Sequence, residues 1–360
     1  MQTEKQQVRW RLLILTMILM LSLVFAPAAA LCSTGFLPTK MYQGVTYEAR
    51  PPSEMTTILL IGYDHMDQGD VTVQQTGNIN GGQADFLLLI LLDHENEQVR
   101  RLQIDRDTMT SVKLYGALGN YLGHRKLQIC LAHAYGDTQE KNNANTIWAV
   151  ENLLQIAEEK DGVQIDWYMT MDISGISRLN ELLGGVTVPI NDDFSHYDET
   201  MVQGTTMRLT GKQAEYYCRA RYHIGEQSNR SRMVRQRTFM SAAGDLLISR
   251  VRKDVNYPRR LLNDMGVIFD TSKALDDGFG FSTSDYKGTP ITESSTHYLM
   301  TNETLDVIVA QIAKAIDYEL VDIETLPGQH TIGSDGYVQY ILDDGAAEEW
   351  AMNAFYRPVE

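Results

Sequence analysis

The chain has 360 residues, of which 43% are hydrophobic and 22% charged, so it is long enough to bury a sizeable core. This composition excludes an intrinsically disordered or fibrous protein. The formal net charge of −16 argues against a nucleic-acid partner, because nucleic-acid-binding domains usually are basic as a whole.

The N-terminus carries an apolar segment behind a basic flank. Three basic residues in positions 1–11 precede an uncharged stretch over 12–31, which as a helix would span about 30 Å, the thickness of a bilayer core. The pattern predicts a cytoplasmic tail over 1–11 and a transmembrane signal-anchor over 12–31, with everything after it outside the cell. A signal peptide cleaved after Ala28-Ala29-Ala30 also fits. We therefore expect a single-pass protein of the cell membrane, or an exported one if the segment is cleaved.

The next predicted elements begin an α/β domain. Gly and Pro residues over 32–54 are typical of a linker, which leaves 55–360 as one extracytoplasmic domain. An apolar run over 57–64 ends at Gly62 and Asp64, as a buried strand does where it meets a loop. A Gly-, Gln- and Asn-rich stretch over 68–83 is expected to be a mobile insertion. Residues 85–93 and 99–104 are predicted to form a β-hairpin.

Later segments alternate between helical and strand patterns. The predictions, in chain order, are a helix over 142–159, a strand over 167–171, a helix over 173–183, a strand over 186–190, a short helix over 209–217, a long amphipathic helix over 230–248, a helix over 305–315 and a β-rich tail around 337–342. Strands that alternate with helices predict a layered α/β architecture.

Two cysteines fall in the folded region. An extracytoplasmic compartment permits a disulfide between Cys130 and Cys218. Two buried free thiols are the alternative, since free cysteine is often a core residue.

Six arginines lie between Tyr216 and Met240 of this acidic chain. Guanidinium groups match phosphate oxygens in pairs and stay charged at any working pH. On an extended segment Arg219 and Arg221 would share a face. Arg232, Arg235 and Gln236 have helical i, i+3, i+4 spacing near a helix N-terminus, where anions bind. The pattern indicates an anion site, and a solvated basic face is the alternative.

Two acidic patterns lie at strand ends. Asp105-Arg106-Asp107 follows a strand, where α/β folds place ligands, although an internally neutralised turn would have the same sequence. Asp64 and Asp85 flank two strands and could hold Mg²⁺ beside a phosphate, since Mg²⁺ takes one or two carboxylates together with phosphate oxygens. Loop capping is the alternative for Asp64 and Asp85.

The order of these segments resembles the LytR-CpsA-Psr (LCP) family of Gram-positive cell-envelope phosphotransferases, over roughly residues 55–345. The resemblance rests on many short motifs in the family's order. They are Ile61-Gly62-Tyr63-Asp64, Gln83-Ala84-Asp85-Phe86, Asp105-Arg106-Asp107, Lys126 with Ala134-Tyr135-Gly136, Glu151 to Leu154, Asp166-Trp167-Tyr168, Leu183 to Val186, Leu209 to Ala214 followed by Arg219-Ala220-Arg221, Ser231-Arg232-Met233-Val234-Arg235-Gln236, and Leu326-Pro327-Gly328.

The resemblance implies a layered α-β-α fold with a central mixed β-sheet, and an enzyme. Family members move a glycopolymer, such as teichoic acid or capsule, from a polyprenyl-pyrophosphate carrier to a peptidoglycan hydroxyl with the help of Mg²⁺. The implied partners are the polyprenyl-pyrophosphate-linked glycan, peptidoglycan and membrane lipid.

The resemblance also assigns roles to residues. The catalytic, pyrophosphate-holding residues would be Arg106, Arg219, Arg221, Arg232 and Gln236. Further substrate contacts would come from Lys126, Arg235 and Asp107, and the metal ligands would be Asp64 and Asp85. A polyprenyl tail also calls for an apolar channel, for which Leu153, Leu179, Leu182 and Met240 are candidates, although core packing explains them equally well.

The sequence departs from the family pattern at four notable positions. Gln83 replaces an arginine, Asp105 replaces the proline before Arg106, Asn229 stands where an aspartate is common, and Ser231 replaces a glycine. These departures leave the general base unassigned. A polyprenyl-pyrophosphate phosphatase and a non-catalytic cell-wall-binding scaffold are the alternative functions.

Overall fold

The computed structural model describes residues 37–64, 82–116, 119–136, 138–156, 163–173, 175–225, 228–270, 298–301 and 305–359. The apolar segment predicted over 12–31 and nearly all of the insertion predicted over 68–83 lie outside these ranges. Among the described helices, none combines the length and apolar character needed to cross a membrane. The chain divides into residues 1–38 and residues 39–360, and the second unit carries the fold described below.

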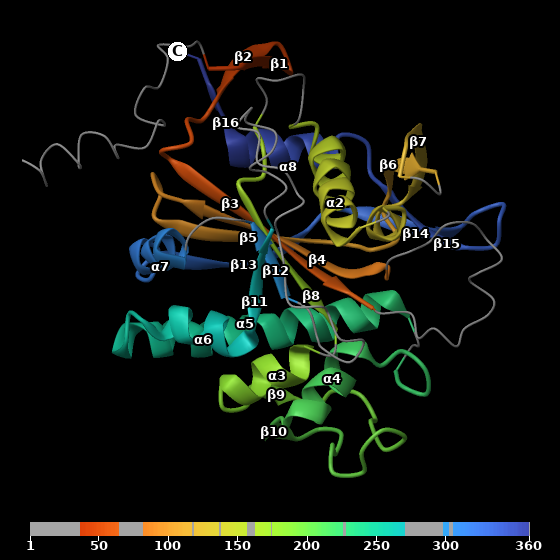
Figure 1. Cartoon of the computed structure of the whole chain (residues 1–360). Helices are drawn as coiled ribbons and strands as arrows, with labels where there is room; N and C mark the ends of the chain where they lie inside the picture. The colour runs from red at the N-terminus through yellow and green to blue at the C-terminus, as the bar shows by residue number, and fades with distance from the viewer. Residues whose placement is uncertain are drawn as a thin grey trace, which may run out of the picture. The chain divides into compact units, whose positions relative to one another are not determined.

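A seven-stranded sheet forms the centre of this unit (Figure 1). Its strands are, in spatial order, β11 (Val267–Asp270), β12 (Tyr298–Thr301), β8 (Trp167–Asp172), β3 (Met55–Tyr63), β4 (Ala84–Asp93), β5 (Gln98–Ile104) and β13 (Glu319–Thr325). The pairs β3–β4, β4–β5 and β8–β12 are antiparallel, whereas β3–β8, β5–β13 and β11–β12 are parallel. The predicted hairpin over 85–104 and the mixed sheet are therefore confirmed.

One face of the sheet is fully buried. Side chains alternate across a strand, and Leu59 and Ile61 of β3 and Leu89 of β4 are at most 1% exposed. They belong to a core that also includes residues of η2 (Ile129–Ala134), α2 (Gln139–Leu154) and α8 (Ala346–Phe355). The helix predicted over 142–159 ends earlier, because Gln155 adopts a left-handed conformation with φ 54° that caps α2.

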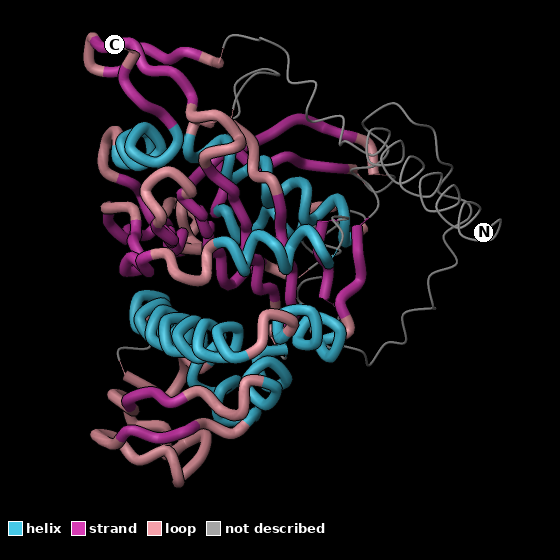
Figure 2. The backbone as a smooth tube through the Cα atoms, turned by 90° about the vertical axis from the view of Figure 1, so that its left-hand side faces the viewer, coloured by secondary structure: helices cyan, strands magenta, loops and turns pink. Residues whose placement is uncertain are grey.

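Helices cover the opposite face as well, so the layers run α-β-α (Figures 1 and 2). The covering helices are α5 (Asn229–Lys253) and α6 (Tyr257–Met265). The Ser228 side chain caps α5 by accepting a hydrogen bond from the Ser231 backbone. On its far side α5 contributes to a second apolar core with α3 (Gly175–Leu182), α4 (Gly211–Arg219), β9 (Thr187–Pro189) and β10 (Thr206–Arg208). The remaining helix is α7 (Leu305–Lys314).

Four small sheets complete the unit, and one of them is the antiparallel pair of β9 and β10. The linker prediction over 32–54 was wrong from residue 39 onward, because β1 (Thr39–Tyr42) and β2 (Val45–Ala49) pair with each other and β2 pairs with the C-terminal strand β16 (Tyr356–Pro358). A partner supplied by the far end of the chain leaves no local sequence signal. The other two sheets are the hairpins β6 (Met109–Tyr115) with β7 (Tyr121–Gln128), and β14 (Gly328–Ile332) with β15 (Val338–Leu342).

The four residues suggested as a channel lining do not lie together. Leu153 belongs to the core on the α2 side of the sheet, whereas Leu179 and Met240 pack against the second core beyond α5. Leu182 is partly buried in α3. Core packing is therefore the correct reading for Leu153, Leu179 and Met240.

Candidate active site

Three carboxylates gather at one end of the central sheet. Asp64 directly follows β3, Asp172 ends β8, and Asp85 lies at the start of β4. Tyr63 pairs with Ala84 and Gly62 with Phe86, so Asp85 is the extra residue of a β-bulge. Bulges re-aim side chains beside functional sites. This bulge lets Asp85 meet residues of α5.

A glycine allows the segment before β4 to lie close to Asp64 at the end of β3. The Asp64 N–H donates to the Gln83 carbonyl over 3.1 Å. A Cβ atom on the neighbouring Gly82 would lie 1.8 Å from the carbonyl oxygen of Asp64, so no other residue fits there without a shift of the backbone. The close approach places Gln83 and Asp85 beside the end of β3.

Two arginines converge on Asp85 from distant parts of the chain. Arg106, just after β5, donates to one carboxylate oxygen, and Arg232 of α5 donates to the other over 2.7 Å. The Arg232 side chain is only 2% exposed and that of Arg106 13%. Burial opposes the ionisation of Asp85, but the charges of Arg232 and Arg106 hold its pKa below the ordinary value. Burial also lowers the pKa of Arg232.

The buried guanidinium groups keep unused donors. The Nε–H groups of Arg106 and Arg232 are buried and have no hydrogen-bond partner among the described residues. Nη2 of Arg106 donates to Gln83 Oε1 and lies 3.3 Å from Cys130 Sγ. A buried N–H donor without a partner lowers the stability of the fold. These N–H groups are therefore suited to donate to an anionic ligand.

Arg219 and Arg221 flank this centre on its more exposed side. Arg219 binds both oxygens of Asp64, over 2.8 and 2.9 Å, and its side chain is 46% exposed. Arg221 is partly buried, and its charge influences the pKa values of Asp85 and Arg232. The two arginines do not share an extended segment, because Arg219 is the last residue of α4.

Gln236 and Asn229 fasten α5 to the sheet. Gln236 accepts from Gln103 of β5 over 3.2 Å and donates to the Cys218 carbonyl over 3.3 Å. Asn229 accepts from Arg232 over 2.7 Å and donates to Asp105 over 2.8 Å. Because these partners hold the first turns of α5, the Arg232 guanidinium has a defined position.

Three predicted substrate contacts have different positions. Asp107 is buried and lies 3.4 Å from the Nε of Arg106, so it supports the centre. Burial, together with the charge of Asp105, raises the pKa of Asp107. Lys126 is exposed on β7, and no contact among the described residues joins it to the arginines.

Arg235 does not face the site. Its guanidinium donates to Asp192 over 2.6 Å and to the carbonyls of Tyr217 and Ala220. The helical spacing placed Arg235 beside Arg232, but a step of three residues turns the side chain toward the loop after α4. The prediction that Arg235 contacts substrate does not fit this position.

The cysteines are separate free thiols, so the disulfide alternative is excluded. Burial raises the pKa of Cys130 to about 11 and also raises that of Cys218. Neither thiol is therefore activated as a nucleophile at neutral pH.

The carboxylate pair suits a hard divalent cation. Burial raises the pKa of Asp64, and the nearby charges of Asp85 and Asp172 raise it further, against the effect of Arg219. A cation would relieve this repulsion, and carboxylate oxygens are the ligands that Mg²⁺ prefers. Asp64 and Asp85 thus offer the ligand type, but Arg219 binds both oxygens of Asp64, and Arg106 and Arg232 bind those of Asp85, so Mg²⁺ would have to displace arginine contacts.

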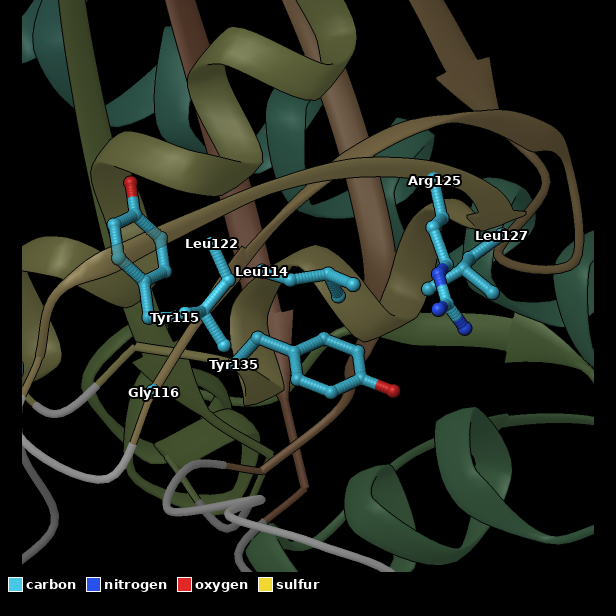
Figure 3. A pocket seen from close by; sticks show the side chains of 7 residues that line it. All are labelled: Leu114, Tyr115, Gly116, Leu122, Arg125, Leu127 and Tyr135. Atoms are coloured by element: carbon cyan, nitrogen blue, oxygen red, sulfur yellow. The ribbon is translucent and has the colours of Figure 1, made fainter.

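A hollow of about 270 Å³ lies beside the β6–β7 hairpin (Figure 3). It is lined by Leu114, Tyr115, Gly116, Leu122, Arg125, Leu127 and Tyr135. Burial raises the pKa of Tyr135, and Arg125 acts against this shift. Lys126, the neighbour of Arg125, is not part of this lining.

Sequence reasoning missed two groups of this centre. Asp172 had a usable signal, because an aspartate that ends a strand next to β3 must lie near Asp64. His330 had none. It approaches Asp105, with 2.9 Å between His330 Nε2 and Asp105 Oδ2, only through the packing of the β14–β15 hairpin.

Comparisons with known proteins agree with this architecture. The model of the LytR_cpsA_psr family matches residues 39–254. A polyisoprenyl-teichoic acid–peptidoglycan teichoic acid transferase TagU from Halalkalibacterium halodurans is 27% identical over 216 residues, which cover 60% of this chain and 63% of that protein. TagV from Bacillus subtilis, with the corresponding transferase name, is 30% identical over 174 residues, which cover 47% of this chain and 40% of TagV. The matched segments thus span about half the length of these relatives.

Solved structures share the fold at low sequence identity. The crystal structure of B. subtilis TagV superposes with a TM-score of 0.53 at 19% identity, covering 84% of this chain and 96% of TagV. The structure of TagT bound to LI-WTA gives a TM-score of 0.54 at 19% identity, covering 85% of this chain and 92% of TagT.

Proposed function

Because this chain belongs to the LytR_cpsA_psr family, we propose that it transfers a glycopolymer from a polyprenyl-pyrophosphate carrier to a hydroxyl group of peptidoglycan. The observation that carries the proposal is the convergence of Arg106 and Arg232 on Asp85, with Arg219 and Arg221 beside them. The names of the TagU and TagV relatives, which are teichoic acid transferases acting on peptidoglycan, support a teichoic-acid-like polymer.

The arginine set suits phosphoryl transfer. This reaction requires positioning of the diphosphate and stabilisation of the charge that develops on its oxygens, and it needs little covalent chemistry from the protein. The Nε–H of Arg232 has no hydrogen-bond partner among the described residues and offers a buried donor for those oxygens, whereas the Nε of Arg106 lies 3.4 Å from Asp107. Arg219 and Arg221, being more exposed, would bind the diphosphate on its solvent side. Gln236 would act by holding α5 in place.

Asp64 and Asp85 would hold Mg²⁺ next to the diphosphate. When bound, the ion would neutralise charge on the phosphate oxygens and on the leaving group. Asp64 would have to share its oxygens between the ion and Arg219, which the exposed position of Arg219 permits.

An apolar strip on the sheet supports a polyprenyl tail as part of the substrate. The face of the sheet toward α5 carries the partly buried apolar side chains Leu60, Phe86, Ile90 and Met171, beside Leu88, which is 2% exposed. Ile58 and Met169 on the same face pack against Trp167 and Leu262 in a small core. Register pairs Leu60 with Leu88, and Gly62 with both Phe86 and Met171, so the partly buried side chains form a strip. The strip starts beside Asp85 and Asp172. Partly exposed apolar groups on central strands suit a hydrocarbon ligand.

The membrane is the proposed location of the reaction. The segment over 12–31 would anchor the protein, and the carrier lipid would come from the same bilayer. Fractionation of cells that express the full chain tests this point. Recovery of the full-length protein in the soluble secreted fraction would indicate cleavage of the segment.

A reconstituted transfer assay tests the function. The full chain in detergent would be mixed with lipid-linked glycopolymer, peptidoglycan fragments and Mg²⁺, and the polymer–peptidoglycan conjugate and the released polyprenyl phosphate would be measured. We expect conjugate, and we expect less of it after chelation of Mg²⁺ by EDTA. Asp64→Asn should raise the Mg²⁺ concentration needed, whereas Asp193→Asn, which removes an exposed carboxylate on a loop, should not.

The assay also separates the alternative functions. Polyprenyl phosphate and free glycan phosphate without conjugate would indicate hydrolysis, the phosphatase alternative. Binding of peptidoglycan with neither product would indicate a scaffold, and either result would contradict the proposed transfer.

A further inference from the structure

Asp105 and His330 form a hydrogen-bonded pair beside the arginines. Asp105 is 6% exposed, and its Oδ1 accepts from the Asn229 side chain over 2.8 Å and from the Asp107 backbone over 2.9 Å. Its Oδ2 lies 2.9 Å from Nε2 of His330. Since two donors already occupy Oδ1, the carboxylate is held as an acceptor, and His330 must present an Nε2–H to it.

The other imidazole nitrogen of His330 remains available. With the hydrogen on Nε2, Nδ1 of neutral histidine carries a lone pair, and no described residue bonds to it. The His330 side chain is 31% exposed, so a substrate group can reach it. Its ring lies 4.7 Å from that of Tyr340, and the Tyr340 backbone donates to the Asp107 carbonyl over 2.7 Å. The β14–β15 hairpin is thus hydrogen-bonded to the segment that carries Arg106.

The pair is connected to the arginine centre by two routes. Asn229 joins Asp105 to Arg232 through hydrogen bonds of 2.8 and 2.7 Å. Asp107 lies 3.4 Å from the Nε of Arg106, and ligating atoms of Asp105, Asp107 and His330 all lie within 4.8 Å of one another. The imidazole therefore lies close to the two guanidinium groups proposed to hold the diphosphate.

A neutral amide of α5 holds the carboxylate of this pair. The Asn229 side chain donates to Asp105, which lies just after β5. A carboxylate that orients a histidine is a recurring arrangement for proton transfer.

We propose that His330 is the general base of the transfer and that Asp105 positions it. The inference rests on the proposed function. The acceptor hydroxyl oxygen forms a bond to the phosphorus that carries the glycan, while the bond from that phosphorus to the bridging oxygen breaks. The bridging electron pair leaves with polyprenyl phosphate, and the hydroxyl proton moves to Nδ1 of His330. Asp105 accepts the Nε2–H throughout and stabilises the imidazolium, which then releases its proton to solvent.

A metal site made of Asp105, Asp107 and His330 is the competing reading. The carboxylate oxygens that such an ion would need already accept hydrogen bonds from Asn229 and, at Asp107, from Gln128 over 3.2 Å. Arg106 adds a positive charge 3.4 Å from Asp107. These contacts favour the base over the cation.

Steady-state kinetics of the full chain in detergent test the proposal. His330→Ala should lower kcat by about 10²–10⁴-fold, the usual contribution of a general base, and leave KM for the lipid-linked donor unchanged. Added imidazole should restore part of the lost kcat. His330→Gln keeps an amide donor for Asp105 but has no basic nitrogen, so it should be as slow as His330→Ala. His196→Ala, at an exposed loop histidine, is the matched control and should keep wild-type kcat.

The role of Asp105 has a separate readout. Asp105→Asn should lower kcat less than loss of the imidazole, and imidazole should not rescue it, because His330 still blocks the position. Wild-type kcat in His330→Gln would overturn the proposal, since a hydrogen-bonding side chain would then suffice. Tight stoichiometric binding of Zn²⁺ alone, lost in both His330→Ala and Asp105→Asn, would overturn it in favour of the metal site.

The two proposals can fail separately. If the wild-type protein releases polyprenyl phosphate but forms no conjugate, the proposed transfer fails, and His330 is judged by the same variants on the hydrolysis rate, where water is the acceptor. If conjugate forms at an undiminished rate in His330→Ala, the transfer is supported and the base assignment fails.

Discussion

At the scale of single residues, Asp85 organises the candidate site. The bulge in β4 turns its carboxylate toward two arginines that are both largely buried, and Asn229 fixes the second of them. Charge-assisted hydrogen bonds are the strong ones, and breaking a buried pair leaves its partner unpaired. Arg232 is thus important for both folding and phosphate binding.

Replacement of Arg232 should affect activity and stability together. Arg232→Ala removes a charged donor worth about 1.5–3 kcal/mol, so kcat for transfer should fall roughly tenfold or more. It also leaves Asp85 buried with one partner, which should lower the free energy of unfolding by about 3–5 kcal/mol. Urea unfolding and the transfer assay measure the two effects.

Two further variants control for this result. Arg232→Lys keeps the charge but cannot bond to Asp85 and Asn229 with one planar group, so it should fall between wild type and Arg232→Ala. Arg260→Ala removes an arginine of α6 that is 54% exposed, and it should change neither quantity. An Arg232→Ala protein with wild-type turnover would contradict the proposed phosphate contact.

At the scale of elements, the strands of the central sheet have two unequal apolar faces. Leu89 of β4 is 0% exposed in the core on the α2 side, whereas its neighbour Ile90 is only partly buried on the side of α5. Leu88, on the same side as Ile90, is 2% exposed, so the α5 side of β4 is covered at one position and partly open at the next. The partly open positions are where the proposed lipid tail would lie.

Paired substitutions in β4 distinguish the two faces. Leu89→Ala should lower the free energy of unfolding by about 2–5 kcal/mol, because it leaves a cavity in the core. Ile90→Asn should lower stability less and should raise KM for the lipid-linked donor. Denaturant melts and donor titrations report the two effects, and an unchanged KM in Ile90→Asn would argue against a lipid path along this face.

A second element-level contact ties the ends of β2 and β4 together. Arg50 binds both oxygens of Asp93, over 2.9 and 2.6 Å, and also bonds to the Ala354 carbonyl of α8. Burial opposes the ionisation of Asp93, but the hydrogen bonds from Arg50 and Asn96 lower its pKa to about 2, from an ordinary value of 3.8. A carboxylate with a lowered pKa stabilises the fold at pH values above its unfolded pKa.

This stabilisation should disappear in acid. As the pH falls from about 4 to about 2, the unfolded chain binds the proton before the folded one does, so the contribution of Asp93 is lost. Asp93→Asn should therefore lower Tm at pH 6 and should lose less further stability than wild type between pH 5 and pH 2.5. Asp322→Asn, an exposed position on β13, should behave as wild type, and equal acid sensitivity in Asp93→Asn would contradict the assignment.

At the scale of the whole molecule, residues beyond the family match complete the fold. The match ends at residue 254, yet β13 extends the central sheet beside β5, β16 pairs with β2, and α8 supplies fully buried Ala354 and Phe355 to the main core. The β14–β15 hairpin adds His330 to the centre. Fold and site therefore both depend on the last hundred residues.

Truncation tests this dependence. A chain that stops at Asp254 should lack a cooperative thermal transition and should be cut rapidly by proteases within residues 39–254, because one face of the core would be uncovered. The full chain should unfold cooperatively and resist the same protease. A truncated protein with an unchanged Tm would show that the C-terminal elements are dispensable for folding.

Local patterns predicted much of the architecture. The alternation of apolar residues in β3 and β4, the short turn between β4 and β5, and the helical spacing in α2 and α5 are properties of neighbouring residues, so they can be read without tertiary contacts. The same holds for the cluster of arginines around Arg232, and for Asp64 and Asp85 at strand ends. The order of the short motifs along the sequence was sufficient to identify the family.

Only the tertiary structure decided which of these residues meet. It placed Arg106 and Arg232 on Asp85, turned Arg235 to Asp192, left Lys126 exposed on β7, and brought His330 to Asp105. It also paired β2 with the end of the chain. All of these outcomes depend on how distant segments pack. The position of Asp85 depends also on the bulge in β4, and that of Arg235 on its rotation around α5 relative to Arg232. Sequence spacing carries the chemistry of each side chain, whereas its partners are set by packing across the whole fold.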